Sequence, residues 1–367
     1  MDGQTQHEWN LNHCPSLMIS WVQRTAPSLW GETRMLFTLT VVMKMMTGLH
    51  YNQRMKHILA LAFVLLSLPT AADEVIRLSQ VRDTYPQLSP DGTRIVFQSN
   101  RSGSNQVWLM NRDGSGVVQL TDVASEGAET PVWSPDGSLI AYAEYLAEGN
   151  NDVFVMKPDG SARARVTSGP GYDGHPHWSA DGKRIVFNSD RDTPDPDVPW
   201  NQRWHDIWSV RADGSDALKH TNCRSVCTYG SLSPDGKYVL YRRVDASSGL
   251  DWALEAIEKN SEVYVAASDG GGARNLSAHP AFDGWPMWSP DGQWIVFASN
   301  RSGPALTGQL WLIRPDGNGL QQLTTGDWGH AQPSWSFSGD SVLAYRFQET
   351  SDWEYGGIAV IRVDAEP

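Results

Sequence analysis

The sequence has little of what marks the commonest enzyme and metal sites. Only three of its 367 residues are cysteines, and the cysteine and histidine spacings typical of zinc sites are missing. It contains no G-x-S-x-G nucleophile motif, no Walker phosphate-binding motif, no H-E-x-x-H pair and no dinucleotide-binding glycine fingerprint. These absences count against a hydrolase of the prolyl-oligopeptidase type, a P-loop enzyme and a Rossmann-type oxidoreductase.

Basic residues are also scarce relative to acidic ones. The chain has 29 Lys and Arg against 42 Asp and Glu, a formal net charge of −13. An acidic protein is not attracted to nucleic acid or to an anionic membrane surface. We therefore expect neither as a partner.

A long apolar run is missing from the start of the chain. The apolar run Ile58–Leu68 follows the short basic stretch Met55–His57. Its length is well below the roughly 20 residues that a membrane-spanning helix needs. Ala72 supplies a small residue for cleavage before Asp73. The pattern predicts a signal peptide over residues 55–72, no membrane span, and a mature chain 73–367 that is periplasmic or secreted.

Residues 1–54 stand upstream of this signal and show neither repeats nor strand alternation. We expect them to be disordered, because translation of the functional protein would start at Met55. The alternative is a genuine N-terminal extension followed by an internal signal anchor.

The remaining chain repeats one phrase six times. The stretch "WSPDGQWIVFASNRSG" near the end is almost the same as "LSPDGTRIVFQSNRSG" near the start, and four weaker copies lie elsewhere. The copies recur every 45–56 residues or so, a period typical of propeller blades of four strands. Their shared serines are Ser89, Ser134, Ser179, Ser233, Ser289 and Ser336.

Each copy predicts four strands joined by tight turns. A short apolar strand precedes the "SPDG" turn, an alternating strand such as "IVF" follows it, and a third strand leads through a "DGS" turn to a fourth ending in "LT". The sixth copy stops after three strands, whereas residues 74–79 match the fourth-strand pattern ahead of the first copy. The sequence therefore predicts an all-β, six-bladed propeller of antiparallel blades, closed when the N-terminal strand completes blade six.

The "WSPDG" turns, the "SNRSG" stretches and the "DGS" turns resemble those of the TolB-like six-bladed propeller family over about residues 74–364. TolB itself has a separate α/β domain before its propeller, whereas here the repeats directly follow the apolar run. The resemblance implies the fold and a binding role in the cell envelope, where the TolB propeller faces a peptidoglycan-associated lipoprotein.

The two ends of the predicted ring differ. The "SPDG" and "DGS" turns share one end, the turn face, and the long variable loops share the other, the loop face. Rigid scaffolds commonly place function on variable loops. The residues just before the inner strands should rim the channel on the loop face as a binding mouth or as simple channel filling: Tyr85, Thr130, His175, Tyr229, Trp285 and Gln332. Trp252, on a predicted helix over 251–259, would cover this mouth, dock a partner or pack onto blade four.

Four histidines map to the same face: His175, His177, His205 and His330. They form either a divalent metal site or ordinary surface and inter-blade contacts. Asp195 and Asp197 are a candidate calcium site or a solvated loop. Arg101, Arg191 and Arg301 occupy one repeat position, which favours a structural role such as pairing with a neighbouring Asp.

Cys223 and Cys227 are close enough in sequence to form a local disulfide, with two free thiols as the alternative.

Two functional hypotheses follow. The first is an exported, monomeric, non-catalytic propeller, which binds an envelope protein or peptide at the loop face; the sequence requires no cofactor and leaves a divalent metal or calcium ion open. The second is a metal-assisted lyase or hydrolase that acts on oligosaccharides at the channel mouth.

Overall fold

The computed structural model of the chain describes residues 74–79, 81–123, 127–147, 150–195, 197–199, 202–244, 261–303, 308–348 and 356–363. The expected extension 1–54, the expected signal peptide 55–72 and Trp252 lie outside these residues. In the described part of the chain, no helix is long and apolar enough to cross a membrane.

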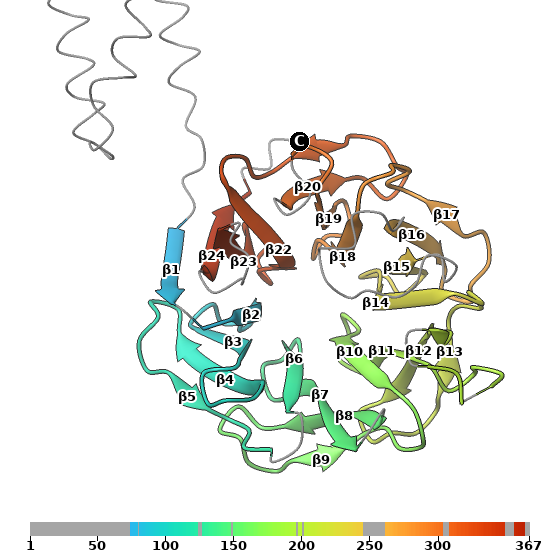
Figure 1. Cartoon of the computed structure of the whole chain (residues 1–367), viewed down its shortest axis with the longest axis horizontal. Coiled ribbons are helices and arrows are strands. Elements are labelled where there is room, and N and C mark those ends of the chain that lie inside the picture. Colours follow the sequence, from blue (N-terminus) through green and yellow to red (C-terminus); the bar gives the residue numbers. More distant parts are fainter. Residues whose placement is uncertain are drawn as a thin grey trace, which may run out of the picture. The chain divides into compact units, whose positions relative to one another are not determined.

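Six four-stranded antiparallel sheets form a ring of blades (Figure 1), as the repeats predict. Blade 1 consists of β2 (Asp83–Leu88), β3 (Arg94–Ser99), β4 (Gln106–Asn111) and β5 (Val118–Gln119). Blade 2 consists of β6 (Ala128–Trp133), β7 (Ile140–Ala147), β8 (Asn150–Met156) and β9 (Ala164–Arg165). Blade 3 consists of β10 (Asp173–Trp178), β11 (Arg184–Ser189), β12 (Asp206–Arg211) and β13 (Leu218–Lys219).

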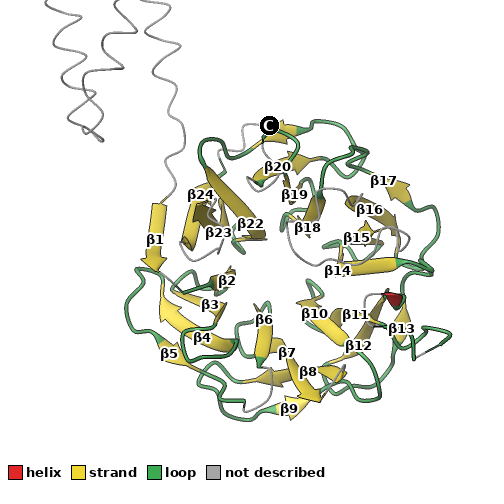
Figure 2. Cartoon of the chain, viewed as in Figure 1, coloured by secondary structure: helices red, strands yellow, loops and turns green. Residues whose placement is uncertain are grey.

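The other half of the ring repeats this order (Figure 2). Blade 4 consists of β14 (Val226–Leu232), β15 (Tyr238–Val244), β16 (Ser261–Ala267) and β17 (Arg274–Asn275). Blade 5 consists of β18 (Asp283–Trp288), β19 (Ile295–Ser299), β20 (Gln309–Ile313) and β21 (Gln321–Gln322). Blade 6 consists of β22 (Trp328–Trp335), β23 (Ser341–Gln348), β24 (Gly356–Arg362) and β1 (Glu74–Ser79).

Strand β1 closes the ring. It pairs antiparallel with β24, with Glu74 opposite Val360 and Ser79 opposite Gly356. The prediction that the N-terminal strand completes blade six is therefore confirmed. Because β1 covers β24, that strand does not present an unpaired edge, which would be a template for aggregation.

The "SPDG" turns are held by their own side chains. In the first copy the Ser89 hydroxyl donates to Asp91 Oδ1 over 2.5 Å and accepts from the backbone N–H of Arg94 at 2.9 Å. The pKa of Asp91 falls to about 2, because this hydroxyl and the backbone N–H of Thr93 both donate to its carboxylate. The motif thus acts as a turn device. In the degenerate sixth copy, which lacks this aspartate, the Ser336 hydroxyl donates to Asp340 Oδ1 at 2.8 Å instead.

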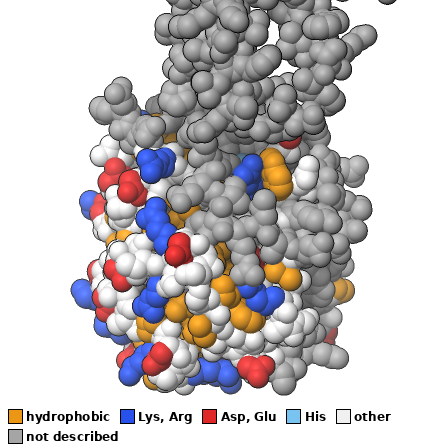
Figure 3. Space-filling model, turned by 90° about the vertical axis from the view of Figure 1, so that its left-hand side faces the viewer, with side chains coloured by type: hydrophobic (Ala, Val, Ile, Leu, Met, Phe, Trp, Pro, Cys, Tyr) orange, Lys and Arg blue, Asp and Glu red, His pale blue; other side chains and the backbone are white. Residues whose placement is uncertain are grey.

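The core lies between the blades. One cluster joins Val96 and Val107 of blade 1 to Trp133 and Tyr142 of blade 2, and similar clusters connect the other neighbouring blades. Trp133 is only 1% exposed. On the outer side of the ring near β1, basic, acidic and apolar side chains are interspersed (Figure 3).

The three repeated arginines have the expected structural role. In blade 5, Arg301 Nη2 lies 2.7 Å from Asp283 Oδ2, its Nε donates to Ser299 Oγ at 3.0 Å, and its guanidinium lies over the Phe297 and Trp311 rings. Arg101 pairs with Asp83 and Arg191 pairs with Asp173 in the same way in blades 1 and 3. Each pair fixes the start of an inner strand, two residues before a predicted mouth residue.

We predict that Arg301→Met lowers the free energy of unfolding by about 3 kcal/mol, because the Asp283 carboxylate, 0% exposed, then loses its cation. Urea denaturation measures this loss. The matched control is Lys183→Met, which breaks the exposed pair with Asp181 and should change stability by less than about 1 kcal/mol. Equal effects of the two substitutions would contradict the structural role of the repeated arginines.

Candidate binding site at the mouth of the central channel

The inner strands surround the centre of the ring (Figure 1), and a cavity of about 90 Å³ lies between them. Its lining comes from the same three consecutive repeat positions in every blade. The first of these positions supplies the six mouth residues, namely Tyr85, Thr130, His175, Tyr229, Trp285 and Gln332. The structure therefore brings together all six side chains that the sequence places at the channel.

All six mouth residues have left-handed backbone conformations, with φ between 50° and 54°. Each lies in a β-bulge, because the pairing of every inner strand shifts at this point; Thr84 and Gln87 pair with Gln98 and Val96, so two residues oppose one. A non-glycine residue in this conformation costs on the order of 1 kcal/mol. The bulge turns six large or polar side chains toward the axis, a feature that the strand pattern did not predict.

Proline follows the mouth residue in five of the six blades. A bulge leaves a backbone N–H without a ladder partner, and proline has no N–H to lose. Neighbouring blades satisfy some of the remaining donors: Gln332 Oε1 accepts from the backbone N–H of Tyr85 at 3.2 Å, and Gln98 Oε1 accepts from that of Thr130 at 3.1 Å. The repeated X-Pro pair was the sequence signal for the bulge.

Two tyrosines cross the channel. Tyr85 of blade 1 and Tyr229 of blade 4 approach from opposite sides, and their hydroxyl oxygens are 3.1 Å apart. The Tyr229 ring also lies 4.1 Å from the His175 ring and 6.1 Å from the Trp285 ring, centroid to centroid. These aromatic side chains form a floor across the mouth.

A hydrogen-bonded chain links two of the histidines beside this floor. His175 Nδ1 lies 2.8 Å from Asn188 Oδ1, and Asn188 Nδ2 lies 3.3 Å from His205 Nδ1. Burial lowers the pKa of His175 to about 3 and that of His205 to about 4. Both imidazoles are therefore neutral at physiological pH.

A carboxyl group lies on the blade 2 side of the mouth. Glu129 Oε1 accepts a hydrogen bond from the Tyr172 hydroxyl at 3.1 Å. Burial raises the pKa of Glu129, although the hydrogen bonds from Tyr172 and Tyr145 oppose the rise. Burial also raises the pKa values of Tyr85 and Tyr229, so both phenols stay protonated.

The structure does not assemble the four-histidine metal site. Among the described residues, no group of three or more His, Cys, Asp and Glu side chains is placed to hold a metal ion. The His177 ring is turned to its own backbone, with Nδ1 2.8 Å from the Trp178 carbonyl oxygen, and His330 is buried in blade 6, where its backbone N–H donates to Gly308. Asp195 and Asp197 are exposed, and Asp195 Oδ1 accepts from the Asp197 backbone N–H.

The channel also has a wider mouth on the turn face, which the repeat pattern did not predict. A cavity of about 250 Å³ is lined there by Trp133, Trp178, Trp288 and Trp335. His177 lines both this cavity and the smaller one. The tryptophans belong to the "WSPDG" phrase, so a turn and core device also lines this mouth.

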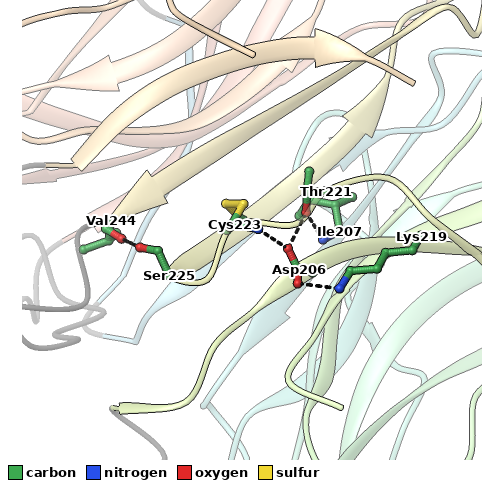
Figure 4. The surroundings of a disulfide bond; sticks show 8 residues. Asp206, Ile207, Lys219, Thr221, Cys223, Ser225 and Val244 are labelled. Atoms are coloured by element: carbon green, nitrogen blue, oxygen red, sulfur yellow. Dashed lines mark hydrogen bonds and ion pairs between the residues drawn. A yellow bond between two sulfur atoms is a disulfide. The ribbon is translucent and has the colours of Figure 1, made fainter. Parts of the chain in front are cut away.

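Cys223 and Cys227 form a disulfide at the start of blade 4 (Figure 4). The backbone N–H of Cys223 donates to Asp206 Oδ1 at 2.7 Å, and Lys219 Nζ lies 2.9 Å from the other oxygen of that carboxylate. The loop is thereby tied to β12, next to His205.

The comparison with protein families decides the affiliation. The model of the TolB beta propeller domain matches residues 124–253 and 247–364. The chain belongs to this TolB propeller family. The family match shows the propeller and leaves the ligand of this TolB-family chain open.

Individual relatives cover the chain in part. It is 30% identical over 282 residues to a TolB homologue from Chlorobium luteolum, covering 67% of this chain and 60% of the relative. It is 28% identical over 260 residues to a dipeptidyl-peptidase 5 from Porphyromonas endodontalis, covering 58% of this chain and 36% of the relative. The chain thus spans less than two thirds of the length of these curated relatives.

A solved structure shares the fold at lower identity. An oligogalacturonate lyase in complex with manganese aligns with a TM-score of 0.51 and 13% identity, covering 78% of this chain and 90% of the lyase. At this identity the likeness shows the fold alone.

We predict that the free energy of unfolding falls between pH 7 and pH 4. The folded pKa values of His175 and His205 lie below the ordinary value of 6.5, so the unfolded state binds more protons in this window. The free energy of unfolding has its full value above about pH 6.5. At pH 5 each of the two histidines lowers it by about 2 kcal/mol, because the unfolded state then binds a proton that the folded state does not.

Urea denaturation at each pH measures this effect. In the double variant His175→Gln, His205→Gln the loss from pH 7 to pH 5 should be smaller by at least about 2 kcal/mol. The control is His279→Gln, outside the hydrogen-bonded chain. An unchanged pH dependence in the double variant would show that these histidines are not buried as neutral groups.

Proposed function

We propose that this TolB-family propeller binds a protein or peptide partner through its loop face, with the mouth of the channel as the centre of the interface. The observation that carries the proposal is the aromatic floor formed by Tyr85, Tyr229, His175 and Trp285. Tyrosine and tryptophan are the residues that most often dominate binding at protein interfaces, because they bury a large area and keep a polar handle.

The electrostatics of the mouth also favour binding over catalysis. A general base works best with a pKa near the operating pH, whereas burial holds those of His175 and His205 at about 3 and 4. The metal-assisted enzyme is supported by the likeness to the manganese-bound lyase, which concerns the fold alone. The four histidines are not gathered as metal ligands within the described part of the chain. We therefore place the binding role first.

The expected location supports a partner in the cell envelope. The signal-like segment 55–72 would direct residues 73–367, the propeller, to the periplasm or outside the cell as a monomer. Resemblance to TolB makes a peptidoglycan-associated lipoprotein the first partner to examine. Residues 1–54 would then have no part in the interaction.

Crosslinking and affinity capture of the tagged protein from envelope extract, read by mass spectrometry, test this function. We predict that one partner is captured in near-equal amount, and that Tyr85→Ala, Tyr229→Ala reduces its capture at least tenfold through loss of aromatic contacts. The matched control is Tyr238→Ala on β15, because Tyr238 is 46% exposed and does not line the channel.

Thermal melting of each variant separates loss of binding from loss of folding. Capture that is unchanged in the double variant would reject the mouth as the interface. A wild-type protein that captures no partner would reject the binding function itself.

A further inference from the structure

Arg242 is a buried cation in blade 4, opposite Thr228, the residue before the mouth residue Tyr229. It lies on β15 with 2% of its surface exposed, and its Nε donates to the Ser261 hydroxyl at 2.5 Å. The guanidinium carbon is 4.8 Å from the centroid of the Phe282 ring. Arginine has five N–H donors, so the single bond to Ser261 leaves four of them without a hydrogen-bond partner among the described residues.

No carboxylate of the described residues pairs with Arg242, unlike the three repeated arginines. Arg101, Arg191 and Arg301 each have an aspartate partner in blades 1, 3 and 5. A buried charge is costly unless an opposite charge and hydrogen bonds compensate it. In blade 4 the compensating anion is therefore expected from outside the described chain.

Within the described part of the chain, the side chains that interact electrostatically with Arg242 are uncharged. Its electrostatic partners are Tyr229 and Tyr85, and burial keeps both phenols protonated. The Arg242 charge also contributes to the lowered pKa of His175, which is neutral. None of these three neighbours therefore neutralises the Arg242 charge.

Arg242 is connected to the floor through ring contacts. Phe282, beneath its guanidinium, lies 5.1 Å from Trp285, and Trp285 lies 6.1 Å from Tyr229, centroid to centroid. Arg242 also pairs across the sheet with Thr228, the residue before Tyr229. In the bond between the Tyr85 and Tyr229 hydroxyls one phenol donates to the other, so one O–H remains as a donor. A guanidinium and a phenol donor suit a carboxylate, which accepts on both oxygens.

We propose that the partner inserts a carboxylate into the loop-face mouth, where Arg242 pairs with it and the hydrogen-bonded pair of Tyr85 and Tyr229 hydroxyls donates its free O–H to it. This inference rests on the proposed function and specifies its ligand as an acidic peptide segment. A peptide suits the aromatic floor, and the Glu129 carboxyl on the blade 2 side directs the acidic group toward blade 4.

The probes are three blocked pentapeptides, Ac-GGEGG-NH2, Ac-GGQGG-NH2 and Ac-GGGGG-OH, titrated into the purified protein by calorimetry. We expect the glutamate peptide or the terminal-carboxylate peptide to bind at least tenfold more tightly than the glutamine peptide. Whichever of the two carboxylate peptides binds more tightly shows whether the carboxylate comes from a side chain or from a chain end. Equal binding of all three, or none at ten-millimolar concentration, overturns the proposal. Tighter binding of digalacturonate than of either acidic peptide overturns it as well.

Two variants assign the effect to the cation. Arg242→Gln should abolish the preference for the acidic peptide, whereas Arg243→Gln is the matched control, since Arg243 neighbours it on β15 but lies over the Tyr264 ring. If Arg242→Gln does not fold, the guanidinium NMR signals of Arg242 in the wild-type protein give the second measurement. They should shift with the acidic peptide and not with the glutamine peptide, and the reverse result rejects the site.

The captured partner separates this inference from the proposed function. If Arg242→Gln and Arg243→Gln capture it equally, the binding function stands and the carboxylate site is wrong. If the wild-type protein captures no partner, the peptide titrations still decide whether the carboxylate site exists.

Discussion

Six left-handed residues within the inner strands are the constraint on which the rest of the channel depends. Each one inserts an extra residue into an otherwise regular antiparallel blade and points a side chain toward the axis. The six bulges stand at one repeat position, and in five blades the following proline removes a donor that the bulge would leave unpaired. Tyr85 and Tyr229, which meet across the channel, both stand in such a bulge.

The repeat was sufficient to predict the blades, the turns and the closing strand, since each of these depends on local patterns such as the Ser89 to Asp91 bond. It also placed the six mouth residues at the channel. The left-handed geometry was not predicted, because strand alternation does not distinguish a bulged residue from a paired one. The turn-face cavity was missed for a different reason: Trp133 and its equivalents serve the core and the cavity at once.

The sequence repeat predicts the role of some arginines around the channel but not that of Arg242. The arginines of the odd-numbered blades share one repeat position and pair with an aspartate from the inner strand, so their role could be anticipated. Arg242 stands on the second strand of blade 4, at a position that matches no motif. Its isolation depends on which side chains surround it in three dimensions, and on burial that keeps the nearby phenols and imidazoles uncharged.

The closing strand has a mechanical consequence. Because β1 runs antiparallel to β24, the first residue of β1 lies opposite Val360, near the last residue of β24. A load applied through the two segments that leave these strands would therefore pull on the same end of the ladder, and its hydrogen bonds would break one after another instead of all together in shear. Blade six would then be the place where the ring opens under tension, while the other five blades, each built from consecutive strands, would stay intact.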